Sequence, residues 1–200
     1  MPLLNSLKEK YIYTWKKMMR YIVTTKTIVT RSLSAQTRRN LERFVESQDE
    51  KIDSRKTEFM QAMKELRNGA KESHWIWYIF PQLKGLGSSP TAKKYEIESE
   101  VEAIQYLKHP VLNPRLIEAL ENVQLHAGKK SASIREVFGS TVDTLKFVSS
   151  ITLFCYVSRN VEGADRVKQL CEELLQVANA EGYPPCNFTL TFLANHSSST

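Results

Sequence analysis

The positions of apolar residues indicate a helical protein. From Asn40 onward, apolar side chains recur at steps of three and four residues, the spacing that places them on one face of a helix. The pattern predicts helices over residues 40–48, 59–66, 75–80, 90–107, 114–127, 140–157 and 163–180. A single helical turn over residues 134–138 and a short element over residues 188–193 complete the set.

Capping residues mark the ends of several predicted helices. Ser89 and Asn113 each precede a proline, the arrangement of an N-cap followed by proline at the first helical position. Asn68-Gly69 and Gly139 are typical helix C-terminal stops. We also expect Ser73 to cap the aromatic segment 75–80.

Two apolar runs, Tyr21–Thr30 and Phe147–Tyr156, also fit β-strands. Helix signals flank the second run, so we interpret it as a buried helix. The sequence therefore predicts an all-α fold, a compact single-domain bundle of about six to eight helices. This domain occupies residues 40–193, after a basic N-terminal extension (residues 1–39) and before a polar tail (residues 194–200).

Charge separates the extension from the domain. Residues 1–39 hold nine Lys or Arg and one acid, a net charge of +8. Residues 40–200 hold 19 basic and 21 acidic residues, a net charge of −2. The domain therefore lacks the basic excess typical of nucleic-acid binding, and we expect no nucleic-acid partner for it.

The role of the extension stays open among three interpretations. It is a segment without a fixed fold or an artefact of gene prediction, a mitochondrial targeting segment, or an arm for a membrane surface or nucleic acid. Its abundance of Lys, Arg, Ser and Thr fits targeting. Four basic residues interrupt Tyr11–Thr30, so we predict no transmembrane helix. We expect an intracellular protein, cytoplasmic unless the extension directs it to mitochondria.

The cysteines do not predict a metal site or a disulfide framework. The chain has an odd number of cysteines, Cys155, Cys171 and Cys186, and no two of them have the spacing of a zinc motif. We expect reduced, structural thiols. No histidine pair has metal-ligand spacing, and Gly85-Leu86-Gly87 lacks the strand and further glycines of a phosphate-binding loop. The sequence thus predicts no metal and no cofactor.

Three separated blocks of the domain resemble an uncharacterised family, domain of unknown function 1810. The most specific block is Ser73–Gly87, which reads SHWIWYIFPQLKGLG. Further matches occur at Tyr95, Glu102, Ala103, Tyr106, Leu107, His109–Leu112, Arg115, Leu116, Phe138, Gly139, Asp143, Lys146, Ser149, Ser150 and Thr152–Phe154. The resemblance covers roughly residues 40–193 and implies a small all-α fold, but no activity. The extension lies outside the pattern, and Asn113 stands where a glycine is expected.

The aromatic segment could form a binding site. At helical spacing, His74, Trp77 or Tyr78, and Gln82 share one face, while the other face is apolar. An imidazole, aromatic rings and an amide suit a planar ligand. Alternatively, His74 and Gln82 satisfy backbone groups inside the core and the tryptophans fill volume.

A second polar group interrupts the apolar segment 140–157. Lys146, Ser149 and Ser150 lie at helical spacing, with Leu145 expected on the core side. A lysine with two hydroxyls suits an anion, and a Ser-Lys nucleophile pair is conceivable. Alternatively, this is a solvated face with an i,i+3 ion pair from Asp143 to Lys146.

His109 and Arg115 flank a loop with prolines at each side. We expect His109 to cap carbonyl groups of the preceding helix rather than act as a general base. Arg115 lies in the first turn of a helix, where a positive charge is disfavoured, which indicates a specific acidic or anionic partner.

These observations favour a domain that binds a small polar or anionic, nucleotide-like ligand in an aromatic-lined pocket. The sequence leaves open whether it is an enzyme, and leaves its oligomeric state open. The alternative is a protein-interaction or structural helical domain without a small-molecule site. The candidate ligand-binding residues are Ser73, His74, Trp77, Gln82, His109, Arg115, Lys146, Ser149 and Ser150.

Removal of residues 1–39 tests the predicted boundary. The chain from Asn40 onward should stay soluble and unfold cooperatively at nearly the temperature of the full chain, because the regular apolar pattern begins there. Thermal unfolding followed by circular dichroism measures this. Aggregation, or a much lower melting temperature, would place part of the extension in the core.

Overall fold

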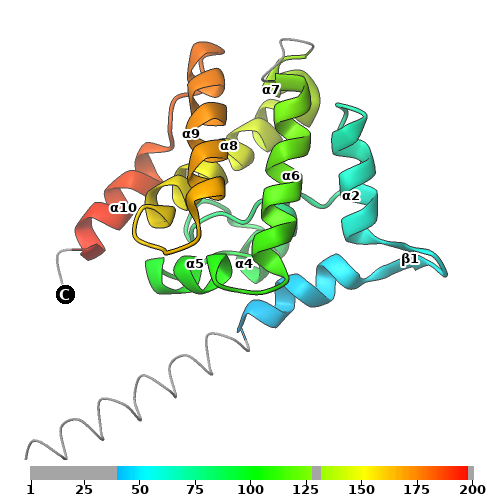
Figure 1. The fold of residues 1–200 in the computed structure, drawn as a ribbon, viewed down its shortest axis with the longest axis horizontal. Helices are drawn as coiled ribbons and strands as arrows, with labels where there is room; N and C mark the ends of the chain where they lie inside the picture. Colours follow the sequence, from blue (N-terminus) through cyan, green and yellow to red (C-terminus); the bar gives the residue numbers. More distant parts are fainter. Residues whose placement is uncertain (1–39, 128–131, 198–200) are drawn as a thin grey trace, which may run out of the picture. The chain divides into compact units, whose positions relative to one another are not determined.

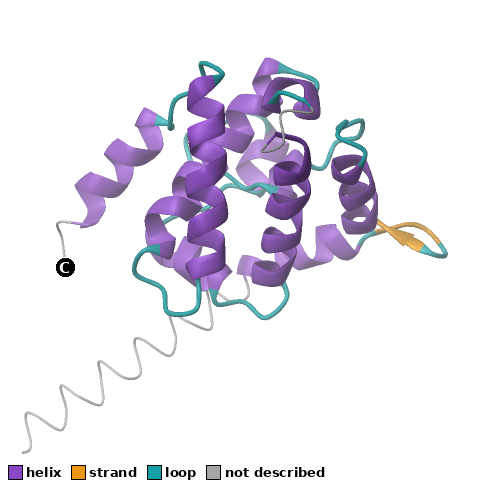
Figure 2. Cartoon of the chain, turned by 45° about the horizontal axis from the view of Figure 1, so that its top comes forward, coloured by secondary structure: helices purple, strands orange, loops and turns teal. Residues whose placement is uncertain are grey.

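The computed structural model describes residues 40–127 and 132–197. These residues form ten helices and one two-stranded hairpin, so the predicted all-α class is confirmed (Figures 1 and 2). The predictions for residues 1–39, including the strand alternative at Tyr21–Thr30, lie outside the described residues. The elements are a helix over residues 40–49, β1 Lys51–Asp53, β2 Lys56–Thr57, α2 Glu58–Arg67, α3 Ile76–Ile79, α4 Pro90–Lys94, α5 Glu100–Leu107, α6 Leu112–Ala127, α7 Ile134–Phe138, α8 Thr141–Ser158, α9 Asp165–Ala180 and α10 Asn187–Ser197.

Side-chain caps fix the starts of α2, α4, α5, α7 and α8. Ser89 caps α4 through the Ala92 N–H at 3.1 Å. Ser140 caps α8 through the Asp143 N–H at 3.0 Å. Gly139 adopts the left-handed conformation that ends α7, as its position predicts. These ends follow from local chemistry, which is why the sequence locates them.

The predicted helix over residues 90–107 is two helices. Ser99 caps α5, and the Ile97 N–H and carbonyl bond to Gln82 and Lys84 at 2.8 and 3.0 Å. This parallel bridge between Leu83 and Ile97 interrupts the helix. A pairing between distant segments therefore overrides the local helical spacing.

His109 caps the helix that follows it, not the one before. Its Nδ1 accepts hydrogen bonds from the N–H groups of Val111 and Leu112 at 3.2 and 3.3 Å. α6 consequently begins at Leu112, ahead of the predicted cap at Asn113. A neutral imidazole nitrogen satisfies the free N–H groups of a helix start as a serine would.

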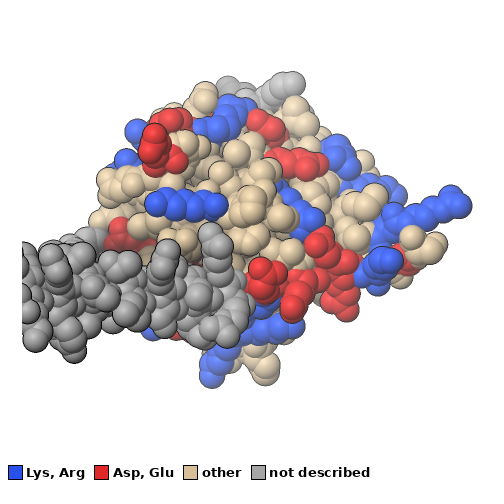
Figure 3. Space-filling model, turned by 60° about the horizontal axis from the view of Figure 1, so that its bottom comes forward, with Lys and Arg blue, Asp and Glu red and all other residues tan. Residues whose placement is uncertain are grey.

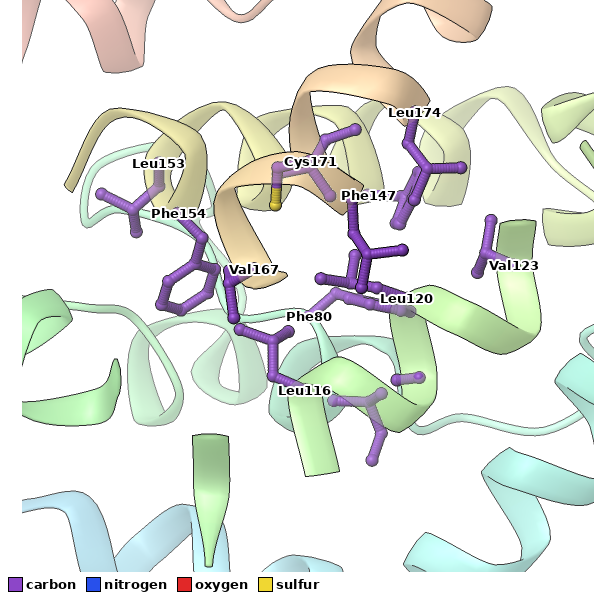
Figure 4. Packing of buried hydrophobic residues seen from close by; sticks show 14 of the residues in the cluster. Phe80, Leu116, Leu120, Val123, Phe147, Leu153, Phe154, Val167, Cys171 and Leu174 are labelled. Atoms are coloured by element: carbon purple, nitrogen blue, oxygen red, sulfur yellow. The ribbon is translucent and has the colours of Figure 1, made fainter. Parts of the chain in front are cut away.

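α8 is the central element of the core. It contacts α3, α5, α7, α9 and α10, and most of its side chains are buried. It is a helix throughout Phe147–Tyr156, so the strand alternative is wrong. Figure 4 shows side chains from α6, α8 and α9 converging, with Phe80 among them. The labelled core residues are Phe80, Leu116, Leu120, Val123, Phe147, Leu153, Phe154, Val167, Cys171 and Leu174.

The described residues contain no helix with both the length and the apolar character needed to cross a membrane.

A buried carboxylate joins α2 to the segment before α3. Glu65 is 2% exposed. Its oxygens accept hydrogen bonds from the N–H groups of Glu72 and Ser73, the Ser73 hydroxyl and the Trp75 indole, at 2.5 to 2.9 Å. Burial acts to raise the pKa of Glu65, but the Ser73 hydroxyl, the N–H groups of Ser73 and Glu72 and the amide of Gln61 outweigh it and lower the pKa to about 2.

We expect Glu65→Gln to destabilise the protein. The variant keeps the volume but turns an amide group toward N–H donors and removes the charge. The shift of the Glu65 pKa from 4.5 to about 2 corresponds to about 3 kcal/mol of stability at neutral pH. The melting temperature should fall by about 10 °C. Because the folded-state pKa is lowered, this stability is present above pH 4.5 and lost as pH falls toward 2.

Glu72→Gln is the matched control, since Glu72 is exposed and gives only its backbone N–H to the network. Thermal unfolding is measured for both variants at pH 7 and across pH 2–5. Only Glu65→Gln should lower the melting temperature at pH 7. Equal melting temperatures for both variants at pH 7 would contradict this role of Glu65.

Candidate functional site

A pocket of about 540 Å³ lies beside α8. Its walls come from α3 and the segment after it, the loop into α4, α4 itself, the first half of α8 and the residue before α10. Four of the predicted ligand-binding residues line it together: Trp77, Gln82, Lys146 and Ser149. The other lining residues are Leu86, Gly87, Ser88, Ser89, Ala92, Val142, Leu145 and Cys186.

Glycine allows the loop wall to approach its neighbours. A Cβ added at Gly87 would collide with the Cβ of Ala92, which is on α4. A Cβ added at Gly85 would lie 3.1 Å from the ring of Phe188, on α10, and Gly85 has a φ of +88°. The loop can therefore close one side of the pocket only with glycine at these positions.

Lys146 has a fixed place at the pocket wall. Its ammonium lies 4.3 Å from the centroid of the Trp77 ring and 2.9 Å from Asp143 Oδ1. The lysine side chain is 19% exposed. The predicted ion pair with Asp143 is confirmed, but it is largely withdrawn from solvent and not a solvated surface pair.

A second lysine shares the same aspartate. Lys71 Nζ lies 2.7 Å from Asp143 Oδ2 and donates a hydrogen bond to the Ser73 carbonyl oxygen at 2.8 Å. Burial acts to raise the pKa of Asp143, but the hydrogen bonds and charges of Lys71 and Lys146 outweigh it and lower the pKa. The cluster of Lys71, Asp143 and Lys146 therefore carries a net charge of one positive unit at neutral pH.

The cysteine in the pocket was not among the predicted residues. Cys186 lies next to Ser149, whose hydroxyl donates to the Leu145 carbonyl oxygen at 2.8 Å. Cys155 and Cys171 are free and buried. One sequence signal could have found it, because Cys186 follows Pro184-Pro185 and precedes a short predicted helix, a typical position for an N-cap residue.

Three predicted residues of the two polar groups lie away from the pocket. His74 is exposed and does not line it. Ser73 is held by Glu65 and does not cap α3, which begins after Trp75 without a side-chain cap. Ser150 is fully buried, and its hydroxyl has no partner within the described part of the chain.

The reason is that α3 is one turn long. The helical spacing that would align His74 with Gln82 does not extend beyond Ile76–Ile79. Trp77 reaches the pocket while Tyr78 is buried and donates its hydroxyl to Glu58 at 2.7 Å. On α8, Leu145 is 50% exposed at the pocket edge, contrary to the expectation that it faces the core.

Arg115 has partners within the chain. It donates to Gln48 Oε1 at 3.2 Å and to Asp49 Oδ1 at 2.6 Å, and its guanidinium lies 4.9 Å from the Phe59 ring centroid. The acidic partner expected for it is therefore Asp49 of the 40–49 helix. Neither Arg115 nor His109 lines the pocket beside α8.

A second pocket of about 540 Å³ lies between the hairpin, α2 and α6. It contains none of the predicted ligand-binding residues. Its lining is Asp53, Arg55, Lys56, Phe59, Met60, Met63, Lys64, Arg67 and Glu118. Figure 3 shows basic side chains at the hairpin end of one face, with acidic ones beside them. No group of three or more potential metal ligands occurs among the described residues.

Comparison with known proteins identifies relatives without a known activity. A search of curated proteins gave no match. The crystal structure of the conserved hypothetical protein Rv1873 from Mycobacterium tuberculosis is similar, with 36% sequence identity and a TM-score of 0.60. The alignment covers 78% of this chain and 96% of the mycobacterial chain. The model of the protein family of unknown function DUF1810 matches residues 38–178, and the chain therefore belongs to this family.

Proposed function

We propose that this domain binds a small anionic molecule in the pocket beside α8. The observation that carries the proposal is the placement of Lys146. Its ammonium is held between the Trp77 ring and Asp143 at the wall of a pocket that also contains Gln82 and Ser149. These residues come from separate segments, so their meeting requires the fold.

The local charge favours an anion. Two lysines share one aspartate, and Lys146 is the charged residue among those that line the pocket. A carboxylate or phosphate group would supply the second negative charge that this arrangement accommodates. The partial burial of Lys146 and Asp143 reduces solvent screening, which strengthens such an interaction.

The remaining lining suits a small organic molecule. Gln82, Ser88 and Ser89 offer polar groups, and Leu86, Ala92 and Val142 offer apolar surface. A volume of about 540 Å³ lies within the range of small-molecule sites. Lys146 occupies one face of the Trp77 ring, so the indole acts here by holding the ammonium rather than by stacking a planar ligand.

Two exposed apolar side chains favour an alternative. Val142 is 62% exposed and Leu145 is 50% exposed, and both line the pocket. Such side chains at a pocket edge also fit contact with a protein partner. In that case the pocket would receive an acidic side chain or chain terminus of the partner, and free anions would bind weakly.

Thermal unfolding with a set of small anions tests the proposal. The probes are phosphate, acetate, a short-chain carboxylate and adenosine monophosphate. A probe present at 100 times its dissociation constant should raise the melting temperature by about 5–10 °C. Lys146→Met should abolish the increase, because it removes the ammonium and keeps the apolar stem.

The control variant is Lys108→Met. Lys108 is exposed at the end of α5 and does not line the pocket. It should respond to the probes as the unaltered protein does. If no probe shifts the melting temperature, or if both variants respond equally to each, the anion site is wrong.

A further inference from the structure

Cys186 stands at the start of a helix and opens into the pocket. Its carbonyl oxygen accepts the Leu190 N–H at 3.1 Å, the first hydrogen bond of α10, so Cys186 is the N-cap residue. Its own N–H donates to Thr152 Oγ1 of α8 at 3.0 Å. These two contacts fix the cysteine backbone against α8. α10 lies beyond residues 38–178, which the family model matches.

Hydrogen-bond donors lie near the Cys186 sulfur. Burial acts to raise the pKa of the Cys186 thiol, but the nearby Thr189 hydroxyl and the N–H groups of Thr189 and Phe188 outweigh it and lower the pKa. The Thr189 side chain is fully buried, and its hydroxyl has no hydrogen-bond partner within the described residues. A thiolate at Cys186 would offer this hydroxyl a stronger acceptor than a thiol does.

The pocket that Cys186 lines also holds a positive charge. Lys146 and Ser149 lie one helical turn apart on α8, and Cys186 lines the same pocket from α10. Lys146 is the charged member of that lining, so no carboxylate in the pocket wall opposes ionisation of the thiol. A thiolate near an ammonium, a helix N-terminus and a ligand pocket has the surroundings of reactive cysteines.

We propose that Cys186 is a reactive thiolate that forms a covalent bond with an electrophilic carbon of a small anionic molecule held by Lys146. This inference rests on the proposed anion site. The thiol proton passes to solvent. The sulfur then attacks the carbon, an S–C bond forms as the bond from carbon to the leaving group breaks, and the leaving group departs with the electron pair.

The other two cysteines are internal references. Cys155 is buried on α8 and Cys171 is buried on α9. Burial raises the pKa of both thiols, so both should stay protonated and react slowly. One experiment on the full chain therefore compares three thiols in the same molecule.

The test uses iodoacetamide, which is neutral, and iodoacetate, which is anionic. The alkylation rate of each cysteine in the full-length native chain is measured by peptide mass spectrometry between pH 5 and 9. Cys186 should react at least about tenfold faster than Cys155 and Cys171 at pH 7. The midpoint of its rate profile should lie below the ordinary value of about 8.5.

A preference of Cys186 for the anionic reagent over the neutral one tests whether the pocket selects anionic ligands. The ratio of the iodoacetate rate to the iodoacetamide rate at Cys186 should be about fivefold higher in the native chain than in the unfolded chain, because an ammonium attracts the anion. Lys146→Met should return this ratio to the unfolded value. Lys108→Met, the control outside the pocket, should leave it unchanged.

A third variant separates ionisation from mere exposure. Thr189→Val keeps the shape of the side chain and removes its hydroxyl, so the midpoint of the Cys186 profile should move to higher pH. An ordinary midpoint in the unaltered chain, or Cys186 reacting as slowly as Cys171, would overturn the reactive thiolate. A low midpoint without any preference for iodoacetate would keep the thiolate and overturn both the anionic ligand class and the proposed anion site.

Discussion

The carboxylate of Glu65 determines where the segment between α2 and α3 lies. Because the side chain is buried, it needs several donors, and the backbone and side chains of residues 72–75 supply them. This places the Trp75 ring in the core and directs Lys71 toward Asp143 of α8. One hydrogen-bonded charge thus sets the route of the chain that reaches the pocket. It also explains how a strongly ionised carboxylate is tolerated inside an apolar protein.

α8 both packs in the core and forms part of the pocket wall, and the segments around it determine which of its residues do which. Most of its surface packs against other helices, while Lys146 and Ser149 reach the pocket. Asp143 is shared by Lys71 and Lys146, which joins the α2–α3 segment to the pocket wall by charge. The result is a partly buried site with an excess positive charge, held in place before any ligand arrives. Such preorganisation lowers the cost of binding.

Cys186 and Lys146 come from helices that are far apart in the sequence. α10 brings the thiol to the pocket because the Cys186 N–H bonds to Thr152 of α8 and Phe188 packs near Gly85. Alone, a cysteine after two prolines indicates little more than a helix start. Its surroundings in space, a buried hydroxyl, two N–H groups and a lysine-bearing pocket, are what distinguish it from Cys155 and Cys171.

The sequence by itself determined the helical class and the helix ends at Ser89, Gly139 and Ser140. These depend on apolar spacing and on caps that lie within a few residues. It also selected Trp77, Gln82, Lys146 and Ser149. Only the tertiary structure decided that these four share a pocket.

The same structure placed the other candidates elsewhere. His74 is exposed because α3 is one turn long, Arg115 pairs with Asp49, and Ser150 faces the core. The bridge between Leu83 and Ile97, the ionised Glu65 and the place of Cys186 likewise depend on contacts between distant segments. Helical periodicity describes which residues share a face of one helix. It carries no information about which distant segment a side chain on that face contacts.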